Sequence, residues 1–124
     1  DGGIARYIPQ VNEPRWRIRL GREAEEDFAR IVRYSHDALG ERQAAKYKTL
    51  LIEALVLLER GPHAPGSAAR DEILPGLRSF HIARRGRPGR HFVLYRASEG
   101  QLIEVLRILH DAMELGRHIP RDGE

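Results

Sequence analysis

The sequence contains no cysteine in its 124 residues. Disulfide bonds, thiolate nucleophiles and cysteine-ligated zinc sites are therefore excluded, and the absence fits a reducing cytoplasm. Long apolar runs are missing as well. A membrane-spanning helix needs roughly 18 apolar residues, whereas the longest candidate, 50–58, is short and contains Glu53. Together with the lack of a signal-peptide pattern, these absences predict one cytoplasmic domain that does not bind a membrane.

The common motifs of enzymes and metal sites are also missing. There is no nucleophile elbow, no phosphate-binding loop and no dinucleotide-binding fingerprint. No helix carries a basic recognition face, which argues against direct sequence-specific reading of DNA. The histidines lack the H-x-x-x-H spacing of helical metal sites, so we expect neither a metal nor a cofactor. These histidines are His36, His63, His81, His91, His110 and His118.

Arginine is what the sequence has in abundance. The formal net charge is +3 and the isoelectric point is about 9.7, which favours anionic partners such as nucleic acid or an acidic protein segment. Four arginines crowd one stretch, 84–90, in which Gly86, Pro88 and Gly89 indicate a hairpin turn. They are Arg84, Arg85, Arg87 and Arg90. Nucleic-acid binding, catalysis on a phosphodiester, docking onto a protein and a simple solvated turn all remain open for this stretch.

The order of predicted elements gives the fold class. Strict alternation over 15–20 predicts a half-buried strand with Trp16, Ile18 and Leu20 on one face. Two helices should follow, one between Gly21 and Gly40 and one from about Glu41 to Arg60. The proline- and glycine-containing stretch 61–76 reads as a surface connection. Strands are then expected over 77–84, 91–97 and 101–109. We therefore predict an α+β fold, β-α-α-β-β-β, with a helical hairpin packed on one face of a small, largely antiparallel sheet.

Two surfaces of the predicted fold are candidates for binding a partner. Arg15, Arg17 and Arg19 share the outer face of the first strand, where they are either solvated or available for contacts. The second helix has an unusually wide apolar arc, because its inner stripe is flanked by Leu50 and Leu57 on one side and by Ile52 and Val56 on the other. Deep burial and a binding groove for another chain both explain such an arc.

A metal-independent ribonuclease is the catalytic alternative. Such an enzyme needs a general base, a general acid and cations around the phosphate. His110 at the end of the last strand is the candidate base, and Tyr95 or His91 the candidate acid. The candidate clamping cations are Arg84, Arg96 and Arg107.

Several segments together resemble the ParE branch of the RelE/ParE toxin superfamily. They are GREAEEDFARIVRYSHDALGERQAAKY, LPGLRSF, HFVLYR and IEVLRILHDAMELGRHIP, the last with the spacing Leu109-His110-x-x-Met113-x-x-x-Arg117-His118. The resemblance runs from Arg15 to Pro120, so 15–120 is expected to be the toxin domain, 1–14 an N-terminal extension or expression remnant, and 121–124 a tail. It implies the fold already predicted from periodicity.

The resemblance also implies a function. ParE-like toxins are type II toxins that inhibit DNA gyrase and are neutralised by a co-expressed antitoxin, whose N-terminal part is a ribbon-helix-helix dimer and whose C-terminal tail wraps around the toxin. The RelE branch instead cleaves ribosome-bound mRNA, and this sequence departs from it in having no lysine in the predicted strands. Expected target-binding residues are Arg84, Arg85, Arg87, Arg90, His110, Met113 and Arg117. Expected antitoxin-binding residues are Leu50, Leu57, Ile52, Val56, Arg15, Arg17 and Arg19.

Overall fold

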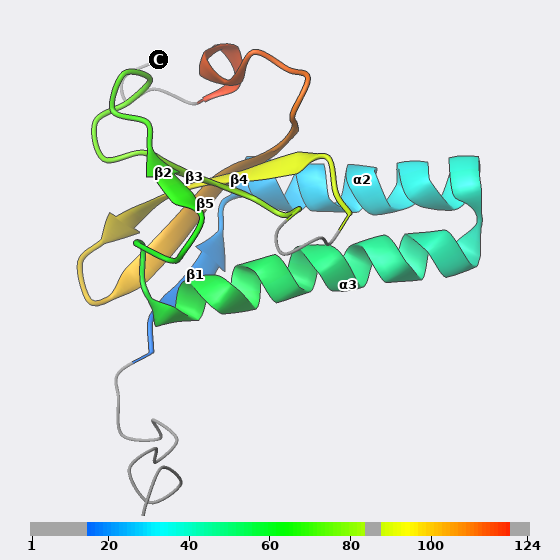
Figure 1. The fold of residues 1–124 in the computed structure, drawn as a ribbon, viewed down its shortest axis with the longest axis horizontal. Coiled ribbons are helices and arrows are strands. Elements are labelled where there is room, and N and C mark those ends of the chain that lie inside the picture. The colour runs from blue at the N-terminus through cyan, green and yellow to red at the C-terminus, as the bar shows by residue number, and fades with distance from the viewer. Residues whose placement is uncertain (1–14, 84–87, 120–124) are drawn as a thin grey trace, which may run out of the picture.

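The computed structural model describes residues 15–83 and 88–119, which form one sheet and one helical hairpin (Figure 1). The elements in chain order are β1 (Arg17–Leu20), α2 (Arg22–Leu39), α3 (Glu41–Leu57), a 3₁₀ turn (Leu58–Arg60), β2 (Ser67–Ala69), β3 (Arg78–His81), β4 (His91–Ser98), β5 (Leu102–His110) and a second 3₁₀ turn (Leu115–His118). The predicted α+β fold is confirmed. The turn that joins α2 to α3 projects beyond the strands (Figure 1).

The sheet has the order β1-β5-β4-β3-β2. β1 pairs with β5 in parallel, and the other neighbouring strands are antiparallel. The pairing of β4 with β5 sets His91 opposite His110 at one end of the sheet. This register later defines the candidate site, because it brings two histidines together that are far apart in the sequence.

Apolar side chains cover both faces of the sheet. The core under the helices contains Leu51, Leu58, Phe80, Tyr95 and Ile103, each at most 1% exposed. A second, smaller cluster on the opposite face consists of Leu77, Leu94, Leu109 and Ile119, with Ile73, Leu74, Phe92, Leu106 and Leu115 packed against it. The residues of β5 are therefore apolar on both faces because both faces are buried.

The prediction for residues 61–76 was wrong in part. The segment contains β2, which pairs with β3, and its Ile73 and Leu74 pack against the second core cluster. Ser67, Ala68 and Ala69 are small residues without an apolar alternation, so their sequence carries no strand signal. β2 forms through backbone hydrogen bonds at the edge of the sheet, which do not depend on side-chain pattern.

The remaining elements follow the sequence signals closely. Trp16, Ile18 and Leu20 pack against the main core, while the three arginines that alternate with them are exposed. Gly40 separates the two helices with a φ of 95°, a conformation that side chains disfavour. None of the described helices is both long and apolar enough to cross a membrane.

Candidate functional site

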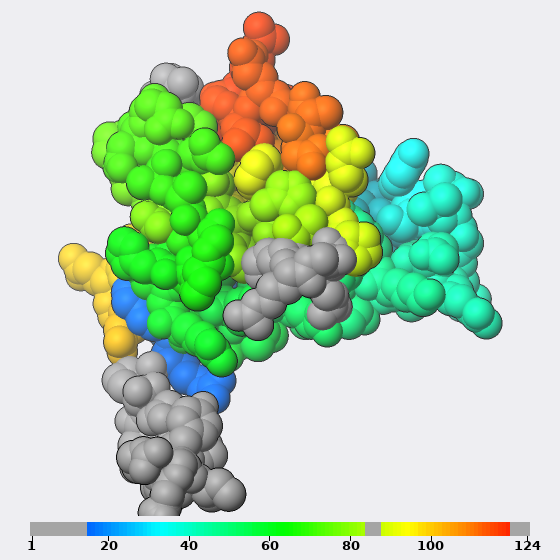
Figure 2. All heavy atoms as spheres, viewed as in Figure 1, coloured from blue at the N-terminus to red at the C-terminus, as the bar shows by residue number. Residues whose placement is uncertain are grey.

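A groove of about 460 Å³ lies between α2 and the ends of β4 and β5. Most of its lining is apolar, and several lining side chains are strongly exposed: Tyr34 is 70% exposed, Leu39 is 65% and Met113 is 40%. Figure 2 shows α2 (cyan) projecting beside the strand ends (yellow) and the C-terminal segment (orange). Exposed apolar side chains that gather in one concave place mark a binding surface more often than scattered ones do.

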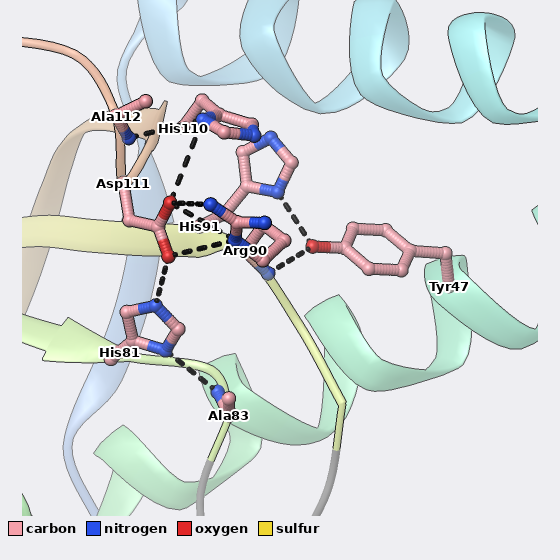
Figure 3. Close-up of polar contacts among 8 residues, drawn as sticks. All are labelled: Tyr47, His81, Ala83, Arg90, His91, His110, Asp111 and Ala112. Carbon is pink, nitrogen blue, oxygen red and sulfur yellow. Dashed lines mark hydrogen bonds and ion pairs between the residues drawn. The ribbon is translucent and has the colours of Figure 1, made fainter.

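Tyr47 on α3 joins the helix to the strand end beside the groove. The backbone N–H of Arg90 donates to Tyr47 Oη at 2.9 Å, so the tyrosine directs its own hydrogen to His91 Nδ1, 2.6 Å away (Figure 3). Burial raises the pKa of Tyr47, which keeps this proton in place. His91 is therefore a neutral ring with its hydrogen on Nε2.

Asp111 is the shared hydrogen-bond partner of Arg90 and His81 at the same end of the sheet. Arg90 binds its carboxylate through Nε at 3.1 Å and through a terminal nitrogen at 3.0 Å, and His81 Nε2 lies 2.9 Å from the other oxygen (Figure 3). The hydrogen bonds from Arg90 and His81 lower the pKa of Asp111 to about 2. The Ala83 N–H donates to His81 Nδ1, which places the hydrogen of the neutral His81 ring on Nε2.

His110 completes the rim of the groove. The Ala112 N–H donates to His110 Nδ1 at 3.0 Å, so the neutral ring carries its hydrogen on Nε2, as His91 does. The two ring centroids are 5.3 Å apart, in an edge-to-face arrangement. In Figure 3 each of the two rings has one nitrogen without a dashed line. These two nitrogens lie on the sides of the rings that are next to each other. Both histidines thus offer N–H donors at the groove.

The half-buried His91 should make the protein sensitive to mild acid. Burial, and then the nearby His110, lower the pKa of His91 to about 4, against an ordinary value near 6.5. Between these two values the unfolded chain binds more protons than the folded one, so stability is complete above pH 6.5 and falls as the pH drops towards 4. After allowance for solvent screening of a half-exposed ring, we expect a loss on the order of 1–2 kcal/mol.

Replacing His91 with glutamine should remove this loss, because the amide oxygen still accepts from Tyr47 but does not titrate. Urea unfolding at pH 7, 5.5 and 4 measures the effect. Asp111 sets a separate window, because its lowered pKa stabilises the fold above about pH 3.9 and this contribution is lost as the pH falls towards 2. Equal pH slopes for the wild type and His91→Gln between pH 6.5 and 4 would rule out His91 as the titrating group.

Asp27 and Arg107 form a buried ion pair at the base of the groove. Asp27 is 1% exposed and accepts two hydrogen bonds from the Arg107 guanidinium, at 2.8 and 2.9 Å, and one from the Ile108 N–H at 2.9 Å. Burial acts to raise the pKa of Asp27, but the hydrogen bonds from Arg107, Ile108 and Arg30 outweigh it, so the pKa is lowered. Arg107 also donates to the His118 carbonyl and thereby holds the C-terminal segment.

The structure brings together part of the ribonuclease set expected from the sequence, because His110, the alternative acid His91 and Arg107 all line the groove. Tyr95 is fully buried, and its hydroxyl donates to the Pro62 carbonyl. Arg96 lies opposite Glu104 and contacts it, away from the strand end that carries His110. Arg107 does reach the groove beside His110, but its guanidinium is bound to Asp27.

The expected target-binding residues are divided between several places. Arg90, His110 and Met113 line the groove together. Arg117 is exposed and pairs with Glu114 at 2.6 Å. Arg84, Arg85 and Arg87 lie outside the described residues.

The expected antitoxin-binding residues also differ in exposure. Ile52 and Val56 are 43% and 50% exposed, whereas Leu50 and Leu57 are partly buried. Arg15, which precedes β1, pairs with Glu59; on β1, Arg19 pairs with Glu104 and Arg17 is exposed. The wide apolar arc thus combines a core stripe with one exposed flank.

Sequence reasoning missed several residues of the groove region, among them Asp27, Tyr34, Leu39, Tyr47 as a hydrogen-bonding group, and Asp111. Leu39 is the last residue of α2 and is 65% exposed, at the end of the hairpin that projects beyond the strands (Figure 1). No local sequence pattern indicates that a helix extends beyond the edge of the sheet on which it packs. Within the described residues, no cluster of three or more histidine, aspartate or glutamate side chains is arranged to hold a metal ion.

The solved structures that share this fold include two from toxin–antitoxin systems. One is from the chromosomal ParDE toxin–antitoxin system of P. aeruginosa, with a TM-score of 0.60 and 22% identity, covering 77% of this chain and 95% of that chain. The other is from the toxin–antitoxin complex RelBE2 of Mycobacterium tuberculosis, with a TM-score of 0.54 and 21% identity, covering 77% of this chain and 98% of that chain. The fold is therefore that of ParE- and RelE-type structures.

A sequence model of the ParE toxin of type II toxin–antitoxin systems, parDE, matches residues 18–115. The chain therefore belongs to the ParE toxin family, and the resemblance stated from the sequence is confirmed. A search of curated proteins found no match.

Proposed function

We propose that this type II toxin acts in the cytoplasm by inhibiting DNA gyrase, and that an antitoxin of the ribbon-helix-helix type neutralises it. The observation that carries the proposal is the match to the ParE toxin model over 18–115. RNA cleavage of the RelE type is the second candidate, because the solved structures similar in fold include one from a RelBE2 complex.

The geometry of the histidines favours binding over catalysis. A general base needs a ring nitrogen with a free lone pair near the proton that it removes. In His81, His91 and His110 the lone pair on Nδ1 already accepts a hydrogen bond, and the hydrogen is on Nε2. In this tautomer the Nε2–H of His91 and of His110 is a donor at the groove, while that of His81 is bonded to Asp111; such donors suit recognition of an anion and not removal of a proton.

The proposed target surface is the arginine-rich end of the sheet. Arg90, His110 and Met113 lie together there, and Arg117 is exposed on the C-terminal segment. Arg84, Arg85 and Arg87 precede Arg90 in the chain and belong to the same proposal. Such a concentration of cations suits an anionic surface, as gyrase bound to DNA would provide.

The proposed antitoxin surface includes the outer face of α3 and the outer face of β1. Ile52 and Val56 offer exposed apolar anchors, one helical turn apart. Arg15, Arg17 and Arg19 offer cations to an acidic tail. A tail that folds on binding needs both, because apolar burial must offset the loss of its conformational freedom.

The proposal predicts the outcome of two parallel assays with the purified full chain. Rising toxin concentration should abolish the supercoiling of relaxed plasmid by gyrase, and it should leave ribosome-bound mRNA intact. An equimolar amount of the co-expressed antitoxin should restore supercoiling.

A second result would decide for the alternative. If gyrase remained fully active at saturating toxin while mRNA on ribosomes was cut, the ribonuclease function would replace this one. His110→Gln is the matched variant for that case, since loss of the imidazole would abolish cleavage but would leave antitoxin binding intact if the antitoxin contacts α3 and β1 alone.

A further inference from the structure

We infer that the apolar segment 4–11 of this chain docks onto the exposed flank of α3. Residues 1–14 lie outside the described residues, and the match to the ParE toxin model begins only at residue 18. The inference therefore concerns a part of the chain that lies outside the family match. It goes beyond the proposed function, and its test requires neither gyrase nor an antitoxin.

The α3 flank is one stripe along the outer side of the helix. It consists of Ala45, Thr49, Ile52 and Val56, whose helical spacing sets them on one face. All four residues are exposed, Ile52 by 43% and Val56 by 50%. The Thr49 hydroxyl donates to the Ala45 carbonyl of the same helix at 3.1 Å, so it is already paired. The stripe therefore offers an uncharged and largely apolar surface.

The described chain begins at the C-terminal end of this flank (Figure 1). The Trp16 N–H donates to the Glu59 carbonyl at 2.9 Å, and the Arg15 guanidinium lies 3.3 Å from the Glu59 carboxylate. Glu59 follows Val56 by one helical turn, so it stands at the end of the stripe. The Trp16 side chain packs against the main core and fixes this position. Residue 14 is therefore joined to the domain beside the α3 flank.

The chain before Arg15 is long enough to reach the flank. Val56 and Ile52 lie three and seven residues from Glu59, the point of entry, which is about 4.5 and 10 Å along a helix axis. The apolar residues at positions 11 and 8 precede Arg15 by four and seven residues, which span up to about 13 and 23 Å when extended. The residue at position 11 can therefore meet Val56, and the one at position 8 can meet Ile52, on a tether that is not fully stretched.

The composition of the segment fits an apolar stripe. Its sequence, IARYIPQV, contains Ile4, Tyr7, Ile8 and Val11 and a single charge, Arg6. A short flexible tether gives its end an effective concentration in the millimolar range. A contact too weak to hold a free peptide is therefore populated within one chain, whereas a second copy meets the flank only at the concentration of the protein itself. This difference favours the chain's own segment as the occupant.

Docking of the segment has a consequence for binding at Ile52 and Val56. A partner would bind only those molecules in which the two side chains are uncovered, so its apparent affinity would fall by that fraction. Both side chains belong to the proposed antitoxin surface, and an antitoxin that binds there would have to displace the segment. The contact lies outside the main core, and it therefore contributes little to the stability of the fold.

The absence of cysteine from the sequence allows a direct test in the full chain. Gln10→Cys introduces a single thiol next to Val11 without replacing an apolar side chain, and a nitroxide label is attached to it. The methyl NMR signals of Ile52 and Val56 should be broadened relative to the same chain after the label is reduced. Leu39 is also exposed but lies at the far end of the helical hairpin, so its methyl signals should stay sharp.

Two variants of the labelled chain separate docking from mere proximity through the tether. Ile8→Ser with Val11→Ser removes two apolar side chains of the segment and should abolish most of the broadening at Ile52. Ala5→Ser with Asn12→Ser is the matched control, because it also places two serines within residues 1–14 but keeps every large apolar side chain of the segment. The control should leave the broadening unchanged.

Three results would overturn the inference. The first is broadening at Ile52 that is no stronger than at Leu39. The second is broadening that Ile8→Ser with Val11→Ser leaves unchanged, because the segment would then lie near α3 only through its tether. The third comes from a mixture of isotope-labelled chain without the cysteine and nitroxide-labelled chain without isotopes. Broadening at Ile52 in that mixture would mean that the segment of a second copy occupies the flank.

Discussion

Replacing Asp27 with alanine should lower the free energy of unfolding by about 3–5 kcal/mol, as expected when one partner of a buried ion pair is removed. The Arg107 guanidinium would keep its charge in a largely buried place with no carboxylate beside it. The Ile108 N–H, which donates to Asp27 inside the core, would also lose its acceptor. Both losses leave buried polar groups unsatisfied, and that is the costly way to remove a hydrogen bond.

Urea unfolding of the full chain at pH 7 measures this effect. Glu26→Ala is the matched control, because Glu26 neighbours Asp27 in the same helix but is exposed, and its loss should change stability by less than about 0.5 kcal/mol. Asp27→Asn keeps the shape but not the charge, so it should fall between the two. A loss below about 1 kcal/mol in Asp27→Ala would mean that water replaces the carboxylate.

Asp27 also illustrates what the sequence concealed. It stands in an acidic run with Glu23, Glu25 and Glu26 near the N-terminus of α2, where the helix dipole alone favours negative charge. Helical spacing does set Asp27 on the same face as Ala24 and Ile31, which could have marked it as an acid at a core position. Its partner could not be named, because Arg107 is 80 residues away and reaches Asp27 only through the packing of β5 on α2.

The overall fold, in contrast, could be predicted, because its sequence signals are local. The alternation over 15–20 and the stop at Gly61-Pro62 required no knowledge of distant residues. The groove required both the β4–β5 register, which sets His91 opposite His110, and the approach of Tyr47 from α3. Neither can be read from the order of residues, so candidates such as His110 and Met113 could be named without the surface that unites them.

The wide apolar arc of α3 could be predicted only in part. Periodicity correctly predicted its inner stripe, but it did not say which flank is exposed. Leu51 is fully buried and Ile52 is 43% exposed, although they are neighbours of similar size in the same helix. The difference arises because the sheet and α2 cover only one side of α3, which is a property of tertiary packing.

Substitutions of the neighbours Leu51 and Ile52 measure where the core ends on α3. Leu51→Ala should cost about 2–5 kcal/mol of folding free energy, because it leaves a cavity among Leu58, Phe80 and the other core residues. Ile52→Ala removes a side chain that is already half in solvent, so its cost should stay below about 1 kcal/mol. Alanine is the better helix former in both cases, so helix propensity cannot produce the difference. Urea unfolding of the two variants under identical conditions gives the comparison. Equal losses would show that Ile52 is also covered within the free protein and is not exposed for an antitoxin to bind.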